Sequence, residues 1–171
     1  VAEPPAAGLS DIPAWKICKI YQWVVTNIEP VADPKDFDYY ALASETMLIK
    51  AGDCEDFGIL LASMYESIGM DAVLVYIDTD NDKISDHLSC AVYYPKDKWT
   101  FMYEEKIIIR ELQINIPAGQ AYELFFEAAG WQYSSKYNEG TWIIVDPIKG
   151  SIPGYVFVAD YAVIELVDAG N

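Results

Sequence analysis

The segment Ala51-Gly52-Asp53-Cys54-Glu55-Asp56-Phe57-Gly58 decides the fold, because it opens a strongly amphipathic stretch of the chain. After Cys54 the apolar side chains recur every three or four residues, as they do on one face of a helix. These residues are Phe57, Leu60, Leu61, Met64, Tyr65 and Ile68. Asp53 is a good helix N-cap, and Asp56 follows at the spacing of a capping box. The pattern therefore predicts a helix that begins at Cys54 and ends near Gly69.

A cysteine in the first turn of a helix is a candidate nucleophile. The thiolate is the reactive form, and the N-terminus of a helix favours it. The carboxylates of Asp53, Glu55 and Asp56 favour the neutral thiol instead, so Cys54 needs a positive partner. A glycine one turn later, Gly58, indicates that another element packs closely against this turn. The alternative is that Cys54 is only a small buried side chain.

Composition narrows the class of protein. The chain has 171 residues, of which 53% are hydrophobic, enough for one domain with a substantial core. We treat residues 1–10 as a tail or linker and residues 11–171 as one domain. The formal net charge of −16 argues against nucleic acid and against anionic membrane surfaces, and it favours cationic partners. No apolar run approaches the ~20 residues of a membrane span, and no signal peptide is visible, so we expect no membrane insertion.

Three cysteines, Cys18, Cys54 and Cys90, are too few and too far apart in the sequence for a disulfide framework. Cys18 lies beside an apolar helical stripe and is most simply a packing residue. The compartment stays undecided, with an extracellular or cell-surface location favoured over the cytoplasm.

The pattern of apolar residues predicts helices first and strands later. We expect a core helix over 13–27 and a short helix capped by Ser44 that runs to Lys50. Further segments are expected as strands over 72–77, 87–94, 99–103, 106–112, 141–145 and 155–167, with one more helix over 119–129. This order predicts an α+β fold.

An acidic loop joins the first two predicted strands. Asp78, Asp80 and Asp82 have the spacing of calcium ligands in an EF-hand. Lys83 replaces the turn glycine of that motif, however, and Ser89 stands where its bidentate glutamate belongs. We therefore interpret the loop as a solvated turn.

His87 is the only histidine, so any mechanism that needs an imidazole must use it. It opens a predicted strand, in which the side chains of His87 and Cys90 point to opposite faces. This argues against a zinc site built from Cys54, His87 and Cys90.

Asp146 follows the apolar run 141–145 and precedes Pro147, which keeps Asp146 extended. A carboxylate there can orient an imidazole; the alternative is an ordinary Asp-Pro turn.

Taken together, the Gly-Asp-Cys-Glu-Asp start of a helix, the histidine that opens a strand and the strand that ends Asp-Pro resemble the transglutaminase-like superfamily, in its archaeal or bacterial form. The stretch 44–48 is similar to the family's approach to its cysteine. The resemblance implies a papain-like α+β fold, in which N-terminal helices and the nucleophile helix pack on an antiparallel β-sheet. It implies Cys54 as nucleophile, His87 as base and Asp146 as orienting acid, without metal or other cofactor.

Two features depart from the family pattern. Residues 98–139 form a probable insertion between the histidine and aspartate strands, so Asp97 competes for the role of Asp146. Leu88 stands where family members often carry an aromatic residue. The aromatic-rich insertion is expected to pack on the sheet and to wall the cleft above Cys54.

The function that this resemblance implies is acyl transfer on amide bonds through a thioester on Cys54. Transfer to water makes the protein a peptidase or amidase, and transfer to an amine makes it a transglutaminase. The expected substrate is a protein or peptide, including one that bears lysine or another amine. A catalytically silent binding module and a Cys/His metal site are the alternatives, and the oligomeric state is open.

Overall fold

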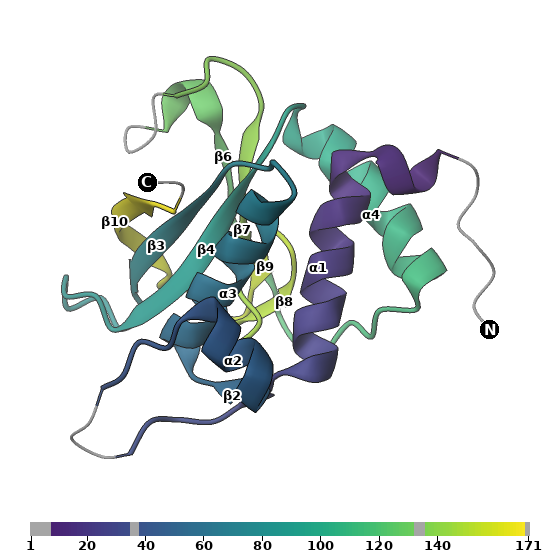
Figure 1. Ribbon diagram of the computed structural model, residues 1–171. Coiled ribbons are helices and arrows are strands. Elements are labelled where there is room, and N and C mark those ends of the chain that lie inside the picture. Colours follow the sequence, from purple (N-terminus) through teal and green to yellow (C-terminus); the bar gives the residue numbers. More distant parts are fainter. Residues whose placement is uncertain (1–7, 35–37, 132–135, 170–171) are drawn as a thin grey trace.

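A computed structural model gives the fold, and it describes residues 8–34, 38–131 and 136–169. Helices lie on one side of an antiparallel sheet, with α1 between α3 and α4 (Figure 1). The described helices are η1 (Leu9–Asp11), α1 (Pro13–Asn27), α2 (Ala43–Ile49), α3 (Cys54–Ser67), α4 (Lys98–Leu112) and η2 (Ala128–Gly130). Among them, none is both long and apolar enough to cross a membrane.

The described strands form three sheets. They are β1 (Glu29–Pro30), β2 (Ala51–Gly52), β3 (Ala72–Asp78), β4 (His87–Tyr94), β5 (Tyr122–Glu123), β6 (Phe125–Glu127), β7 (Thr141–Val145), β8 (Gly150–Ile152), β9 (Tyr155–Val156) and β10 (Ala162–Asp168). The main sheet has the order β10-β3-β4-β7-β6, and all its neighbours run antiparallel. Two smaller sheets contain β1-β2 and β5-β9-β8. The strand that begins with His87 therefore lies at the centre of the main sheet.

The core has two parts, one on each side of that central strand. On the helix side, Cys90 and Val92 of β4 pack with Tyr65 of α3 and Ile17 of α1. On the other side, Ala91 of β4 belongs to a second cluster, built around the buried aromatic and aliphatic residues Trp131, Trp142, Ile144 and Val156. The alternation of side chains along β4 follows the period of two that the sequence predicted.

Helices α1 and α3 and strands β3 and β4 confirm the expectations from sequence. Helix α1 has the predicted bounds, and α3 begins at Cys54 as predicted. Cys18 is a buried packing residue, also as expected. One cap was predicted wrongly: Ser44 lies inside α2, whose N-cap is Leu42, and the side chain of Glu45 accepts the backbone N–H of Leu42 at 2.8 Å.

The prediction of strands over 99–103 and 106–112 is wrong, because both segments belong to the single helix α4. Isoleucines at 107–109 favour a strand locally. The helix forms because Asp97 caps it, accepting the backbone N–H groups of Trp99 and Thr100 at 3.0 Å each. Its buried residues, Phe101, Glu105 and Ile108, recur at helical spacing.

The helix predicted over 119–129 is also wrong. Phe125 and Phe126 instead pair with Ile143 and Trp142, so β6 becomes an edge strand of the main sheet. The strand predicted over 155–167 is two separate strands, β9 and β10, which belong to different sheets. For residues 119–129, pairing with β7 thus overrides a local pattern that fitted helix and strand almost equally.

Candidate active site

The approach to Cys54 is a tight turn that only glycine can occupy. Strand β2 pairs in parallel with β1 and delivers the chain to Gly52. A Cβ at Gly52 would lie 2.6 Å from the Cβ of Asp56, which is closer than side chains approach in proteins. The last acid of the Gly-Asp-Cys-Glu-Asp segment, Asp56, therefore leaves no room for a side chain at Gly52.

Asp56 holds the turn together and does not face a substrate. Its side chain is buried, and Oδ1 accepts the backbone N–H of Ala41 at 2.8 Å. Oδ2 accepts the backbone N–H of Asp53 at 3.4 Å, as in the predicted capping box. Asp56 thus fixes both the start of α3 and the loop that runs in front of it.

Cys54 opens α3, and its thiol lies between a carboxylate and a strand. Sγ lies 2.9 Å from Oε2 of Glu55, which accepts the thiol proton in a hydrogen bond. The backbone N–H of Leu88, in β4, also hydrogen-bonds the sulfur. Burial, followed by the hydrogen bond to Glu55, raises the pKa of Cys54 to about 12, and the Leu88 N–H only partly opposes this rise. Burial and the carboxylate of Glu55 thus favour the neutral thiol over the thiolate.

Two carboxylates lie beside the thiol, and a hydrogen bond joins them. Burial and a hydrogen bond with Glu55 raise the pKa of Asp53 to about 6. Burial also works to raise the pKa of Glu55, but hydrogen bonds from Cys54 and Asp53 outweigh it and lower that pKa below its ordinary value. Glu55 is therefore the ionised acceptor, and the thiol keeps its proton in this arrangement.

Gly58 explains how Cys54 comes to meet β4. A Cβ at this position would lie 3.2 Å from the backbone oxygen of Ser89 and 3.4 Å from the side chain of Leu88. The absence of a side chain lets the first turns of α3 lie directly on the start of β4. The close contact predicted from this glycine is confirmed, and β4 is the element that makes it.

His87 and Asp146 form a buried pair. Nε2 of His87 lies 2.7 Å from Oδ2 of Asp146, and the two residues are 4% and 3% exposed. Because β4 pairs with β7, the residue after β7 reaches the start of β4 despite its distance in the sequence. With Nε2 bound to the carboxylate, Nδ1 is the ring nitrogen left for a second partner.

Asp146 is held by four donors. Oδ1 accepts the backbone N–H groups of Ile148 and Lys149, each at 2.9 Å. Oδ2 accepts His87 and also the hydroxyl of Tyr161, at 2.8 Å. These contacts fix the plane of the carboxylate.

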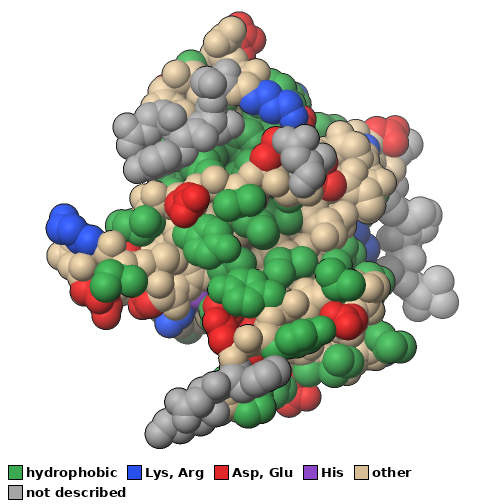
Figure 2. All heavy atoms as spheres, turned by 60° about the vertical axis from the view of Figure 1, so that its left-hand side comes forward, with side chains coloured by type: hydrophobic (Ala, Val, Ile, Leu, Met, Phe, Trp, Pro, Cys, Tyr) green, Lys and Arg blue, Asp and Glu red, His purple; other side chains and the backbone are tan. Residues whose placement is uncertain are grey.

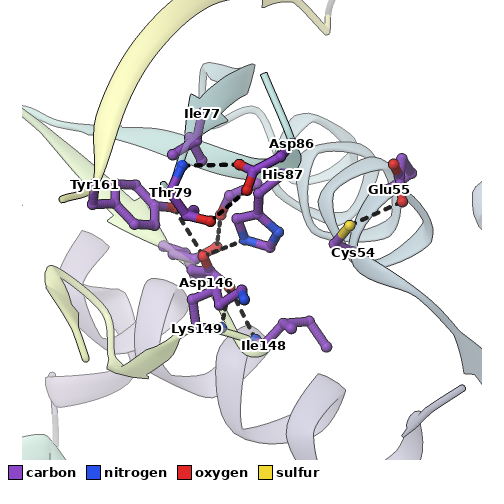
Figure 3. A network of polar contacts seen from close by, with 12 residues as sticks. Cys54, Glu55, Ile77, Thr79, Asp86, His87, Asp146, Ile148, Lys149 and Tyr161 are labelled. Carbon is purple, nitrogen blue, oxygen red and sulfur yellow. Dashed lines mark hydrogen bonds and ion pairs between the residues drawn. The ribbon is translucent and has the colours of Figure 1, made fainter. Parts of the chain in front are cut away.

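The His87 ring is drawn between Asp146 and Cys54 in Figure 3. Within the described part of the chain, no hydrogen bond joins Sγ of Cys54 to the ring; the sulfur bonds to Glu55 and Leu88 instead. His87 nevertheless lies close enough to Glu55 for its charge to lower the pKa of that carboxyl. The structure thus brings His87 and Asp146 into contact and sets Cys54 against the residue next to His87.

Asp97, the alternative to Asp146 as the orienting acid, is the N-cap of α4. Its Oδ1 caps α4, and its Oδ2 accepts the hydroxyl of Thr100 at 2.7 Å.

The alternative of a zinc site built from Cys54, His87 and Cys90 is not supported either. Cys90 is fully buried in the helix-side core, whereas the His87 ring binds Asp146.

Two acidic groups could in principle hold a cation. Asp33, Asp38 and Asp53 form one group of three among the described residues, and the acidic loop after β3 forms the other. In that loop the oxygens of Asp78 accept the backbone N–H groups of Asp80, Asn81 and Lys83. These bonds make the loop a closed turn in which Asp78 is buried and Asp80 and Asp82 are exposed.

The insertion extends the main sheet and the helical layer. Strand β6 pairs with β7, α4 packs on α1, and Trp131 packs against Trp142. After α4, Gln113, Ile114, Asn115 and Pro117 line a cavity of about 440 Å³ together with Pro147, which follows Asp146 in the chain. Packing on the sheet is therefore confirmed. The tip at 132–135 lies outside the described residues, so the wall above Cys54 stays a prediction.

A comparison with family models identifies the superfamily. The model described as the transglutaminase-like superfamily matches residues 7–103, more than half of the chain. The chain belongs to the transglutaminase-like superfamily. The matched part contains Cys54 and His87 and ends before Asp146.

Among solved structures, the chain is similar to Legionella pneumophila LapG, with a TM-score of 0.56 and 15% sequence identity. The similarity covers 94% of this chain and 68% of LapG. At this identity it shows the fold alone, and that fold is the transglutaminase-like one expected from sequence. A search of curated proteins found no match.

Sequence reasoning missed three contributors to the site. It weighed Glu55 only as one of several negative charges and did not predict its hydrogen bond to the thiol. The Leu88 N–H carries no side-chain signal. Tyr161 was placed inside a continuous strand, and nothing in its neighbourhood marks it as a partner of Asp146.

Proposed function

We propose that this protein is a cysteine-dependent acyl-transfer enzyme acting on amide bonds. Cys54 is the nucleophile, His87 the base and Asp146 the residue that orients His87. The observation that carries the proposal is the buried 2.7 Å contact between His87 and Asp146. It lies at the start of the strand whose next residue, Leu88, binds the sulfur of Cys54.

The proposed reaction begins when the thiol leaves Glu55 and turns to His87. Nε2 of His87 donates to Asp146, so Nδ1 accepts the thiol proton while sulfur attacks the carbonyl carbon. Cys54 opens α3, so its backbone N–H lacks a partner within the helix and can stabilise the oxyanion.

The imidazolium then returns its proton to the leaving amine as the C–N bond breaks, which leaves a thioester on Cys54. Water or a second amine adds to the thioester, gives a proton to His87 and releases the thiol. Water makes the enzyme a peptidase or amidase, and an amine makes it a transglutaminase. All steps balance without an oxidant or reductant.

The surface near the thiol favours a polypeptide as substrate. Tyr40 is exposed. Its pKa is raised, first by what burial it has and then by neighbouring charges that include Glu55 and Cys54. Tyr40 therefore lies near the site. Further along the same loop and in α2 come exposed Leu42, Leu48 and Ile49. On the face shown in Figure 2, hydrophobic side chains gather with acidic ones among them. Such a surface suits an apolar segment that also carries lysine or arginine.

Selective alkylation tests the proposal, and the chain contains its own controls. Cys18 and Cys90 are fully buried, whereas Cys54 is partly exposed. Burial above all raises the pKa of both buried thiols. Substoichiometric iodoacetamide at neutral pH, followed by mass spectrometry of the peptides, is expected to find the label on Cys54. Equal labelling of the three thiols, or none at Cys54, would favour the silent binding module.

A further inference from the structure

We propose that Tyr161 is a positioning residue of the acyl-transfer site. It holds the carboxylate of Asp146 in the orientation in which Oδ2 meets the His87 ring, and it keeps water from that contact. The inference rests on the proposed function, but its test reads the geometry of the pair directly.

The hydrogen bonds of Asp146 divide between its two oxygens. Among the described residues, Oδ1 accepts hydrogen bonds only from backbone N–H groups, which come from the turn after β7. Oδ2 binds two side chains, His87 at 2.7 Å and Tyr161 at 2.8 Å. A hydroxyl that approaches Oδ2 beside the imidazole restrains rotation of the carboxylate, because turning it would break both bonds.

Burial makes this hydroxyl important. His87, Asp146 and Tyr161 are 4%, 3% and 9% exposed, so water supplies little of the hydrogen bonding that an ionised carboxylate needs. The phenol takes the place that a water molecule would otherwise have on Oδ2. Burial first, and the charge of Asp146 second, raise the pKa of Tyr161 well above its ordinary value, so the hydroxyl remains a donor.

The ring of Tyr161 also shields the imidazole. The two rings meet edge to face, with centroids 6.2 Å apart and planes at 75°. One side chain thus contacts both members of the pair, binding Asp146 through its hydroxyl and packing on His87 through its ring (Figure 3).

The register of the sheet explains how a residue so late in the chain arrives there. Tyr161 immediately precedes β10, in which Val163 is opposite Ile77 of β3. Ile77 is in turn opposite His87 of β4. The C-terminal edge strand therefore carries Tyr161 to the end of the sheet where the site lies.

The test compares Tyr161→Phe with Tyr65→Phe. Both changes remove the hydroxyl of a buried tyrosine, but Tyr65 donates to the backbone oxygen of Ile17 at 3.1 Å. Tyr65 lies eleven residues beyond Cys54, about 16 Å along α3. The control therefore reports the effect of losing a buried phenol hydroxyl away from the site.

The first readout is the proton on Nε2 of His87. Because the chain has one histidine, its imidazole N–H resonance in a proton NMR spectrum needs no further assignment. In the wild type and in Tyr65→Phe this proton is expected to exchange slowly with water. In Tyr161→Phe its exchange is expected to be at least about tenfold faster, because a hydrogen bond to a charged group is lost.

The second readout is the rate at which Cys54 is alkylated at neutral pH. Tyr161→Phe is expected to slow this reaction about tenfold, and Tyr65→Phe to leave it within about twofold of wild type. Unchanged proton exchange in a folded Tyr161→Phe would overturn the proposal and reduce Tyr161 to a packing residue. Faster exchange with unchanged labelling would contradict the proposed function while leaving the positioning role intact.

The wild-type protein supplies a check that needs no variant. A hydroxyl bound to a buried carboxylate is expected to give its own slowly exchanging resonance, with a nuclear Overhauser effect to the His87 ring. If Tyr161→Phe fails to fold, the absence of this resonance from the folded wild type would still overturn the proposal.

Discussion

The two halves of the candidate site are built in opposite ways. His87 and Asp146 are buried and already in contact, and four donors hold the carboxylate in place. Cys54 is only partly buried, and its proton is engaged by Glu55. One half is arranged for proton transfer before any substrate arrives, whereas the other is held in its neutral, unreactive form.

Under the proposed function, this difference indicates which step activates the site. His87 needs no rearrangement, so activation is the exchange of Glu55 for His87 as the partner of the thiol. A carboxylate beside a thiol protects it from unwanted oxidation and alkylation, because only the thiolate reacts readily. The four predictions below test this contrast.

The largest effect is expected from His87→Ala. Without an imidazole the thiol has no base, and no other histidine can replace it. We expect the rate of Cys54 alkylation near neutral pH to fall about a hundredfold or more, with a melting temperature near that of wild type. Mass spectrometry over a time course measures the rate. An unchanged rate would show that the two halves do not work together.

Asp146→Asn is expected to have the next largest effect. The amide keeps an oxygen for the backbone N–H groups of Ile148 and Lys149 but loses the charge that stabilises the imidazolium. We expect labelling of Cys54 to fall about tenfold to a hundredfold while the fold is retained. Asp146→Ala also removes the turn contacts and is expected to cost about 1–3 kcal/mol of stability. Urea denaturation of both variants separates the two effects, and equal stability would contradict this account of the turn.

Glu55→Gln is expected to have an opposite and smaller effect, namely faster labelling. The carboxylate raises the pKa of Cys54, so its removal lowers that pKa and increases the thiolate fraction at any pH below about 12. We expect labelling at pH 8 to rise severalfold, and the difference from wild type to shrink as the pH approaches 12. Glu111→Gln on α4 makes the same charge change at an exposed position and serves as the control. A rate that falls in Glu55→Gln would mean that Glu55 assists the thiol.

Gly58→Ala is expected to have the smallest effect, on the contact that joins the two halves. Alanine favours a helix by about 1 kcal/mol over glycine, but its Cβ would press on the backbone oxygen of Ser89 in the central strand. We expect a net loss of about 1–2 kcal/mol in urea denaturation. Gly130→Ala, where a Cβ meets nothing within 4 Å, is the control. A stabilised Gly58→Ala protein would show that β4 can shift away from α3.

The local features around Cys54 were readable from sequence because they depend on neighbours in the chain. A helix start needs an N-cap and an acid three residues later, and Asp53 and Asp56 stand at those positions. Gly58 pointed to a close contact because a helix interior rarely accepts glycine without a reason. His87 was identifiable because it is the only histidine, and Asp146 because proline keeps it out of a helix.

The errors fall where local pattern and tertiary pairing disagree. The isoleucines of α4 favour a strand, and the residues around β6 (Tyr122, Phe125, Phe126 and Ala129) have helical spacing. Their true states depend on packing against α1 and on pairing with β7, which lie far away in the sequence. A short apolar run fits helix and strand almost equally well, so only its distant partner decides.

What the sequence by itself determined is therefore the start of α3 at Cys54, the superfamily that the chain resembles, and Cys54, His87 and Asp146 as candidate site residues. Only the tertiary structure decided how they are connected. It set the His87 ring against Asp146 and placed the Cys54 thiol in a hydrogen bond with Glu55. It also brought the Tyr161 hydroxyl, just before the last strand, to the Asp146 carboxylate. The physical reason is that helix caps and strand alternation act over a few residues, whereas hydrogen bonds between buried side chains depend on sheet register and on the depth to which each group is removed from water.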